Sequence, residues 1–133
     1  MLKKIVILFT LLFSFSYGDF KGLNPAQLQE MIDKNIVVID IRTAPEWIET
    51  GVVPRSKKMM FFTSTGHYDI NGWMEKFSKY VKDKSQPFVL VCRSGNRTGT
   101  VGNFLSKKLK YQNVYHLQNG IKSWIYENRK TIK

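Results

Sequence analysis

The sequence predicts an α/β fold in which a parallel β-sheet carries helices on both faces. Segments with strand character alternate along the chain with segments of helical periodicity, and this alternation is typical of parallel sheets. The strand segments 36–41 and 88–91 are nearly continuous apolar runs, as expected of strands buried on both faces. The chain of 133 residues is long enough for one such domain and too short for two ordinary ones.

Capping signals mark the helices of the first half of the domain. Asn24 followed by Pro25 supplies an N-cap and a proline at the first helical position. Thr43 to Glu46 form a capping box, and Gly51 can end the helix that this box opens. The elements predicted here, in order, are a helix at 25–35, a strand at 36–41, a helix at 44–50 and a strand at 58–62.

Apolar spacing marks the helices of the second half. Trp73 and Phe77 recur at helical spacing with Tyr80 and Val81, and we expect the first two to be core residues. After a polar loop at 63–71 and this helix, three elements are predicted. They are a strand at 88–91, a helix that starts near Thr98 and presents Val101, Phe104, Leu105 and Leu109, and a strand at 114–117. A last helix presents Ile121, Trp124 and Ile125 and ends near Arg129.

Residues 1–18 have the layout of a secretory signal peptide. Two lysines precede an apolar run at 5–13, and small residues stand three and one positions before a cleavage point after Gly18. The run is too short to span a bilayer comfortably. We therefore expect cleavage, a mature domain at 19–133, a periplasmic or otherwise exported location, and no stable membrane span. The alternative is an N-terminal anchor that is never cleaved.

The charge balance favours anionic partners. The formal net charge is +11, and removal of Lys3 and Lys4 leaves +9, which concentrates anions near the surface. The basic residues are scattered and form no repeat interleaved with aromatic residues. We therefore expect a small anionic substrate and no nucleic acid partner.

The cysteine and histidine content excludes several kinds of site. Cys92 is the only cysteine, so neither an intramolecular disulfide nor a zinc site with several cysteines can form. His67 and His116 lie far apart in the sequence and do not indicate a metal. We expect neither a metal nor a cofactor. We expect His67 to lie in an exposed polar loop and His116 to be a packed ring near a strand end.

Cys92 follows a buried strand and precedes a helix, where ligands bind in open parallel sheets. Backbone N–H groups of the turn 93–97 can form a concave anion cradle, and the helix start adds partial positive charge. Gly95 permits unusual backbone angles, and Arg93 and Arg97 add full charges. These surroundings favour the thiolate, which indicates a nucleophile that must be reachable from solvent. The alternative, a small buried apolar residue, leaves the polar turn unexplained.

The stretch Cys92-Arg93-Ser94-Gly95-Asn96-Arg97 resembles the active-site loop of rhodanese-domain sulfurtransferases. Other segments resemble the remaining elements of that family in the right order. These are Val38 to Arg42 with Pro45-Glu46-Trp47, Gly51 to Pro54, and Leu117 to Gly120 with Trp124. Three departures lie outside the loop. Val52 stands where the family usually has histidine, Arg55-Ser56 replace Gly-Ala, and Asn119 replaces a glycine.

The resemblance implies a sulfurtransferase that uses a persulfide on Cys92. An anionic donor such as thiosulfate would supply a sulfane sulfur, and cyanide, a thiol or a protein acceptor would remove it. Cys92 and Arg97 would be the catalytic residues, with Arg97 orienting the cradle or the donor. The residues implied to bind substrate are Arg93, Ser94, Gly95, Asn96, Arg97 and Thr98. Asp40, Arg42 and Glu46 are expected to be structural charges near the sheet edge.

Two other functions remain open from the sequence. Phosphatases and arsenate reductases of the same fold have a longer loop between cysteine and arginine, whereas only Arg93 to Asn96 intervene here. The narrower ring suits a single sulfur atom. A persulfide carrier, which delivers sulfur to a partner protein without efficient turnover, is the second hypothesis.

Overall fold

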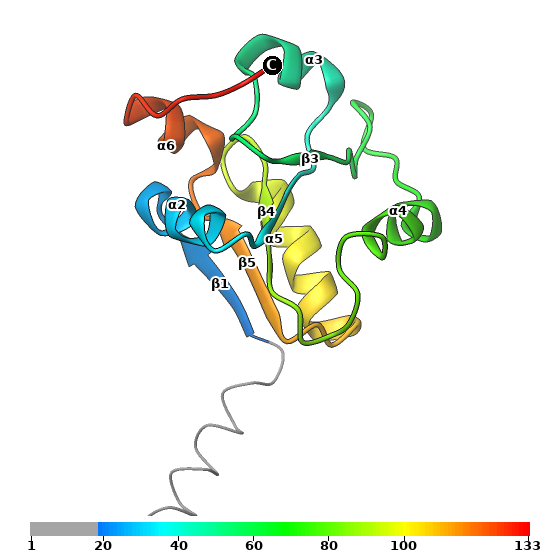
Figure 1. Ribbon diagram of the computed structural model, residues 1–133. Coiled ribbons are helices and arrows are strands. Elements are labelled where there is room, and N and C mark those ends of the chain that lie inside the picture. Colours follow the sequence, from blue (N-terminus) through cyan, green and yellow to red (C-terminus); the bar gives the residue numbers. More distant parts are fainter. Residues whose placement is uncertain (1–18) are drawn as a thin grey trace, which may run out of the picture.

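The computed structural model describes residues 19–133, and the predicted signal peptide at 1–18 lies outside the described residues. One sheet of parallel strands runs in the order β1-β5-β4-β2-β3 (Figure 1). The strands are β1 (Asp19–Leu23), β2 (Val37–Asp40), β3 (Lys57–Lys58), β4 (Phe88–Val91) and β5 (Asn113–Leu117). The predicted α/β class with a parallel sheet is confirmed.

Helices cover both faces of this sheet. They are α2 (Pro25–Asp33), α3 (Ala44–Thr50), α4 (Ile70–Phe77), α5 (Asn96–Asn103), the π-helical turn η1 (Phe104–Lys108) and α6 (Gly120–Tyr126). Side chains of α2 and α6 pack on one face, and those of α4, α5 and η1 pack on the other. Within residues 19–133, no helix has the length and apolar character needed to cross a bilayer.

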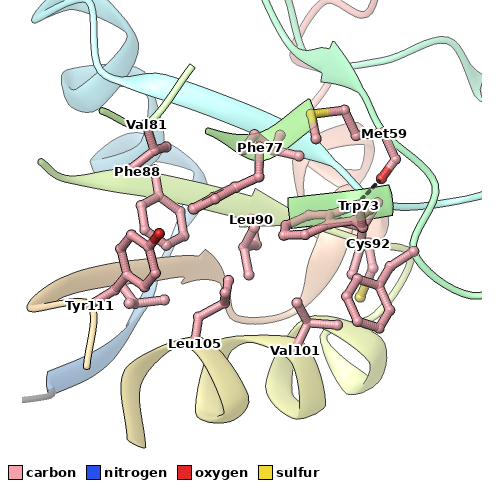
Figure 2. Close-up of a cluster of buried hydrophobic side chains, with 14 residues drawn as sticks. Met59, Trp73, Phe77, Val81, Phe88, Leu90, Cys92, Val101, Leu105 and Tyr111 are labelled. Atoms are coloured by element: carbon pink, nitrogen blue, oxygen red, sulfur yellow. Dashed lines mark hydrogen bonds between the residues drawn. The ribbon is translucent and has the colours of Figure 1, made fainter. Parts of the chain in front are cut away.

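The central strand β4 shows how the sequence builds two cores at once. Successive side chains of a strand point to opposite faces. Phe88 and Leu90 therefore join the core beneath α4 and α5, whereas Val89 and Val91 join the core beneath α2 and α6. Cys92 continues the first series, and Figure 2 shows it in the same cluster as Leu90. The alternation thus turns the thiol toward the face that α5 covers.

Two strand predictions differ from the structure. The strand expected at 58–62 is reduced to the two-residue ladder of β3 beside β2. Backbone hydrogen bonding nevertheless continues, because Met59 N–H donates to Asp40 O at 2.9 Å and Phe61 N–H to Ile41 O at 3.1 Å. β1, which pairs with β5 along its whole length, was not among the predicted strands.

Helix positions agree with the sequence except near their ends. α5 begins at Asn96, two residues before the predicted start, and α6 ends at Tyr126 rather than near Arg129. Ile125, predicted on the apolar face, is 40% exposed, whereas Ile121 and Trp124 of the same helix are buried in the core. Trp73 and Phe77 are buried, which confirms that they are core residues.

The last residues of the chain fasten the segment that follows α3. Ile132 and Val52 exchange two backbone hydrogen bonds of 2.7 and 2.9 Å as an antiparallel bridge. Thr131 Oγ1 donates to Thr50 O at 2.8 Å, and Trp124 Nε1 donates to Lys130 O at 2.8 Å. α3 is thereby fixed beside the carboxyl ends of the strands (Figure 1).

Candidate active site

Cys92 stands directly after β4, at the carboxyl edge of the sheet. The turn that follows it leads into α5, whose N-cap is Gly95 in the left-handed region with a φ of 100°. A Cβ atom at Gly95 would collide with the carbonyl oxygen of Gln118. This position therefore requires glycine for both its backbone angle and its close approach to a neighbouring loop.

The turn directs hydrogen-bond donors at the sulfur. Gly95 N–H donates to Cys92 Sγ at 3.2 Å, and Thr98 N–H donates at 3.5 Å. Thr98 Oγ1 lies 3.4 Å from the same sulfur. The first turn of α5 thus forms a cradle of N–H groups around Sγ, which is a suitable environment for negative charge on sulfur.

The expectation that the sulfur is reachable from solvent is not met in this structure. Cys92 is only 1% exposed. Its side chain follows Phe88 and Leu90 onto the face of the sheet that packs against α4 and α5, and the turn after Cys92 folds back over it. Within that turn, Arg93, Ser94 and Asn96 are exposed.

Arg97 is held by Glu46 rather than directed at the sulfur. Its two terminal nitrogens donate to the two carboxylate oxygens of Glu46 at 2.8 and 2.7 Å. The hydrogen bond from Arg97 lowers the pKa of Glu46 to about 2, while partial burial opposes the shift. The same hydrogen bond raises the pKa of Arg97. Arg97 therefore remains charged and fixes α5 to α3.

Glu46 is positioned by the capping box that the sequence predicts. Its carboxylate accepts hydrogen bonds from the Thr43 backbone N–H at 3.2 Å and the Thr43 hydroxyl at 2.9 Å. One carboxylate thus caps α3 and binds Arg97. Its structural role agrees with expectation, although its partner is Arg97 at the start of α5 rather than a charge at the sheet edge.

Asp40 and Arg42 form a separate ion pair that is fully buried, with side chains 0% and 1% exposed. Arg42 Nε and Nη2 donate to the Asp40 carboxylate at 3.0 and 2.9 Å. Arg42 Nη2 also donates to Gly51 O at 2.9 Å, and Trp47 Nε1 donates to Asp40 Oδ1 at 3.0 Å. These bonds join the end of β2 to the middle of α3 and to Gly51, which caps its C-terminal end, as expected for structural charges.

The segment after β5 is hydrogen-bonded to the backbone of the turn that begins at Cys92. Ile121 N–H donates to Cys92 O at 2.9 Å, and Lys122 N–H donates to Arg93 O at 3.2 Å. Gly120 has a φ of 69°, and a Cβ there would collide with Arg93 O. The start of α6 therefore sets the path of the backbone around Cys92.

The remaining predicted residues are distributed unevenly around the sulfur. Thr98 is buried against it, whereas the side chains of Arg93, Ser94 and Asn96 face solvent. His67 is exposed in its loop, as expected, with Nδ1 2.9 Å from Thr65 Oγ1. No three His, Cys, Asp or Glu side chains among residues 19–133 gather as a metal site.

His116 is the site residue that sequence reasoning missed. It is packed, as predicted, with 9% exposure, but its Nδ1 also lies 2.7 Å from Thr98 Oγ1. Burial lowers the pKa of His116, which favours the neutral ring. The available signal was its place near the end of β5, because the ends of neighbouring parallel strands lie side by side.

Comparison with known proteins decides the family. A family model described as the rhodanese-like domain matches residues 24–127. The chain belongs to the rhodanese-like domain family. The match includes the whole turn around Cys92 and the Glu46–Arg97 pair, and it supports sulfur transfer as the general activity of this rhodanese-like chain.

Curated relatives of this rhodanese-like chain include proteins with a named activity. Thiosulfate sulfurtransferase GlpE of Ectopseudomonas mendocina is 26% identical over 107 residues, which cover 80% of this chain and 86% of the relative. The uncharacterized protein RP600 homolog of Rickettsia rickettsii is 28% identical over 89 residues, which cover 65% of this chain and 69% of the relative.

Solved structures show the same fold. A rhodanese-related protein from Thermoplasma volcanium has a TM-score of 0.60 and 26% identity over 83% of this chain and 95% of its own. The polysulfide-sulfur transferase homodimer of Wolinella succinogenes has a TM-score of 0.60 over 96% of this chain and 88% of its own. At 20% identity, the second likeness concerns the fold alone.

Proposed function

We propose that this protein is a sulfurtransferase that moves a sulfane sulfur from an anionic donor to a thiophilic acceptor through a persulfide on Cys92. The observation that carries the proposal is the cradle of Gly95 and Thr98 N–H groups, 3.2 and 3.5 Å from Sγ. These donors stabilise negative charge on sulfur without reorganisation during the reaction. The family match supports the same chemistry.

Charging of the enzyme forms one bond to sulfur and breaks another. The Cys92 thiolate attacks the outer sulfur of thiosulfate, the Sγ–S bond forms, and the S–S bond of the donor breaks. Sulfite leaves with the electron pair, and the persulfide retains one negative charge. Arg93 is exposed at the turn, where its charge attracts the anion.

Discharge reverses the roles of the sulfurs. Cyanide or a thiolate attacks the outer sulfur of the persulfide, and the electron pair of the Sγ–S bond returns to Cys92. The same N–H groups then stabilise Cys92 as a leaving thiolate. Polysulfide is a further class of sulfur donor. The protein of similar fold from Wolinella succinogenes is named a polysulfide-sulfur transferase.

Mass spectrometry of the protein after incubation with thiosulfate tests this proposal. We expect a mass increase of one sulfur atom, located on Cys92, that disappears when cyanide is added. Cys92→Ser should keep the fold and acquire no sulfur. Absence of the added sulfur in the wild-type protein, or its presence in Cys92→Ser, would contradict the proposal.

The burial of Cys92 favours a second candidate, a persulfide carrier that delivers its sulfur to a partner protein. A covered persulfide is protected from water and from competing thiols. Steady-state assays with thiosulfate and cyanide separate the two candidates. Many rapid cycles support the enzyme, whereas a single stoichiometric transfer that a protein acceptor accelerates supports the carrier.

We also propose that the chain is exported, with cleavage after Gly18. β1 begins at Asp19 and pairs with β5 from that residue onward, so that removal of residues 1–18 leaves the strands of residues 19–133 in place. Intact mass spectrometry of protein recovered from the periplasm or medium should give a mature chain that starts at Asp19. Soluble protein that retains Met1 would contradict this expectation.

A further inference from the structure

The hydroxyl group of Thr98 lies at the centre of a buried set of polar atoms. Its Oγ1 is 3.4 Å from Cys92 Sγ, 2.7 Å from His116 Nδ1 and 3.2 Å from Gly95 O. Thr98 is 0% exposed and Cys92 is 1% exposed. The hydroxyl is therefore surrounded by protein atoms, and its proton can be assigned among these three neighbours.

A single hydroxyl proton cannot serve three neighbours. Gly95 O can only accept a hydrogen bond, and the sulfur accepts one when it is a thiolate. If Nδ1 of His116 carries a proton, it donates to Thr98 Oγ1 in both states of the sulfur. The hydroxyl proton is then free to point to Gly95 O while Cys92 is a thiol, and to Sγ when Cys92 is a thiolate.

The surroundings of His116 favour a neutral ring in this role. Its neighbours across the sheet are Gly22 on β1 and Leu90 on β4. The ring of Phe20 packs on it with ring centroids 4.5 Å apart. Lys21 on β1 pairs with Tyr115. Its side chain therefore projects from the face of the sheet opposite to the one that carries the His116 ring.

Cys92, directly after β4, is the titratable group on the other side of Thr98, which α5 places between the sulfur and His116. Burial lowers the pKa of His116, so proton transfer from the thiol to the ring is disfavoured. With its one proton on Nδ1, the neutral ring acts as a hydrogen-bond donor to Thr98 Oγ1 and not as a base.

We propose that His116 is a positioning residue that aligns the Thr98 hydroxyl as an additional hydrogen-bond donor to the Cys92 thiolate. The proposal rests on the proposed function, because the proposed reaction uses the Cys92 thiolate as nucleophile in charging and as leaving group in discharge. It assigns to a residue of β5 a part in the chemistry of the sulfur that follows β4.

The two half-reactions should respond differently to this donor. A stabilised thiolate is a better leaving group, but its intrinsic nucleophilicity is lower. Loss of the donor should therefore slow discharge of the persulfide more than charging. A residue with only a structural role would affect both half-reactions alike or act through stability.

The first test measures thiolate formation directly and requires no sulfur transfer. The ultraviolet absorbance of the thiolate is followed against pH, with the Cys92→Ser counterpart of each variant subtracted. His116→Phe keeps a ring against Phe20 but removes the donor, and its thiolate should form at higher pH than that of the wild type. His116→Asn places an amide N–H near the position of Nδ1 and should restore the wild-type profile.

Thr98→Val removes the hydroxyl without altering the ring and keeps the proposal testable if His116→Phe does not fold. It should move the absorbance profile in the same direction. The double variant should move it no further than Thr98→Val alone, because His116 acts through Thr98. Additive shifts, or an unchanged profile in folded His116→Phe, would overturn the proposal.

The second test measures single-turnover rates of charging by thiosulfate and discharge by cyanide. Discharge should fall about tenfold in His116→Phe, the effect of one hydrogen bond to a charged group, and charging should fall less. Tyr115→Phe, on the opposite face of β5, is the matched control and should leave both rates unchanged. Equal losses in both half-reactions would overturn the proposal.

The two proposals fail in different ways. If the wild-type protein acquires no sulfur from thiosulfate but the absorbance profiles shift as described, the proposed function is wrong and the positioning role of His116 stands. If the persulfide forms normally but the absorbance profiles of the wild type and the variants coincide, the positioning role of His116 is wrong and the proposed function stands.

Discussion

Glu46 and Arg97, 51 positions apart in the sequence, are joined by two parallel hydrogen bonds of 2.8 and 2.7 Å. The first residue belongs to α3 and the second to α5. Bidentate pairs of this kind fix orientation as well as distance. The start of α5, and with it the turn after Cys92, is therefore fixed to α3.

Removal of Arg97 should impair sulfur transfer more than removal of Arg93. In Arg97→Ala the turn loses its attachment to α3, and misplacement of a reacting group by about 1 Å can cost roughly a hundredfold in rate. Arg93→Ala removes only an exposed charge, and its smaller effect should disappear at high ionic strength. Turnover with thiosulfate and cyanide at low and high salt measures both variants. Equal effects would show that the two arginines have been assigned wrongly.

The Glu46–Arg97 pair should make stability depend on pH in the acid range. The pKa of Glu46 is about 2 in the folded protein, compared with an ordinary value of 4.5, so the unfolded chain takes up the proton first. The contribution of the pair is therefore complete above about pH 4.5 and is lost as pH falls toward 2. Denaturant unfolding at a series of pH values should show a shallower acid slope for Glu46→Gln than for the wild type. Parallel slopes would contradict this assignment.

Alanine at Gly95 should disrupt the cradle. The φ of 100° is unfavourable for a side chain, and the added Cβ would meet the backbone of Gln118. We expect a loss of about 1–3 kcal/mol in the free energy of unfolding from strain alone, together with a large loss of transfer.

Gly66→Ala is the matched control for this variant. Gly66 has a similar φ of 84°, but apart from its own residue and its two chain neighbours no heavy atom lies within 4 Å of its added Cβ. It should cost some stability and leave transfer intact. Loss of transfer in both variants would mean that backbone strain, and not the shape of the cradle, is responsible.

The covered position of Cys92 should separate small reagents from large ones. At 1% exposure, a bulky maleimide can label the thiol only after the turn opens locally. Labelling of the native protein should be more than about tenfold slower than labelling in denaturant, whereas thiosulfate should charge the native protein. Fast maleimide labelling under native conditions would show that the turn is open in solution.

Local sequence signals predicted where the thiol lies in the fold, but not the contacts that hold the residues around it. The apolar run at 88–91 and the polar turn after Cys92 were sufficient to place the cysteine at the carboxyl edge of a parallel sheet. The contacts of Glu46 with Arg97 and of Thr98 with His116 join residues from different elements. Their partners depend on how α3, α5 and β5 pack, and no periodicity in the sequence reports that.

The errors in the strands have a similar cause. β1 has the sequence Asp-Phe-Lys-Gly-Leu, in which lysine and glycine conceal the pattern of a buried strand. It forms because β5 offers an unpaired edge. Conversely, the apolar segment 58–62 favours a strand, but only two residues form the ladder with β2. Tertiary pairing outweighed local propensity in both places.

The direction of β1 has a consequence for how the domain can be tethered. β1 runs parallel to the other strands, so it enters the sheet at the edge opposite to the one that carries Cys92. Any leader, affinity tag or membrane anchor joined ahead of Asp19 therefore attaches at the amino ends of the strands, on the side of the sheet away from Cys92. A domain held in this way on a surface would present its reactive sulfur outward, toward incoming substrates.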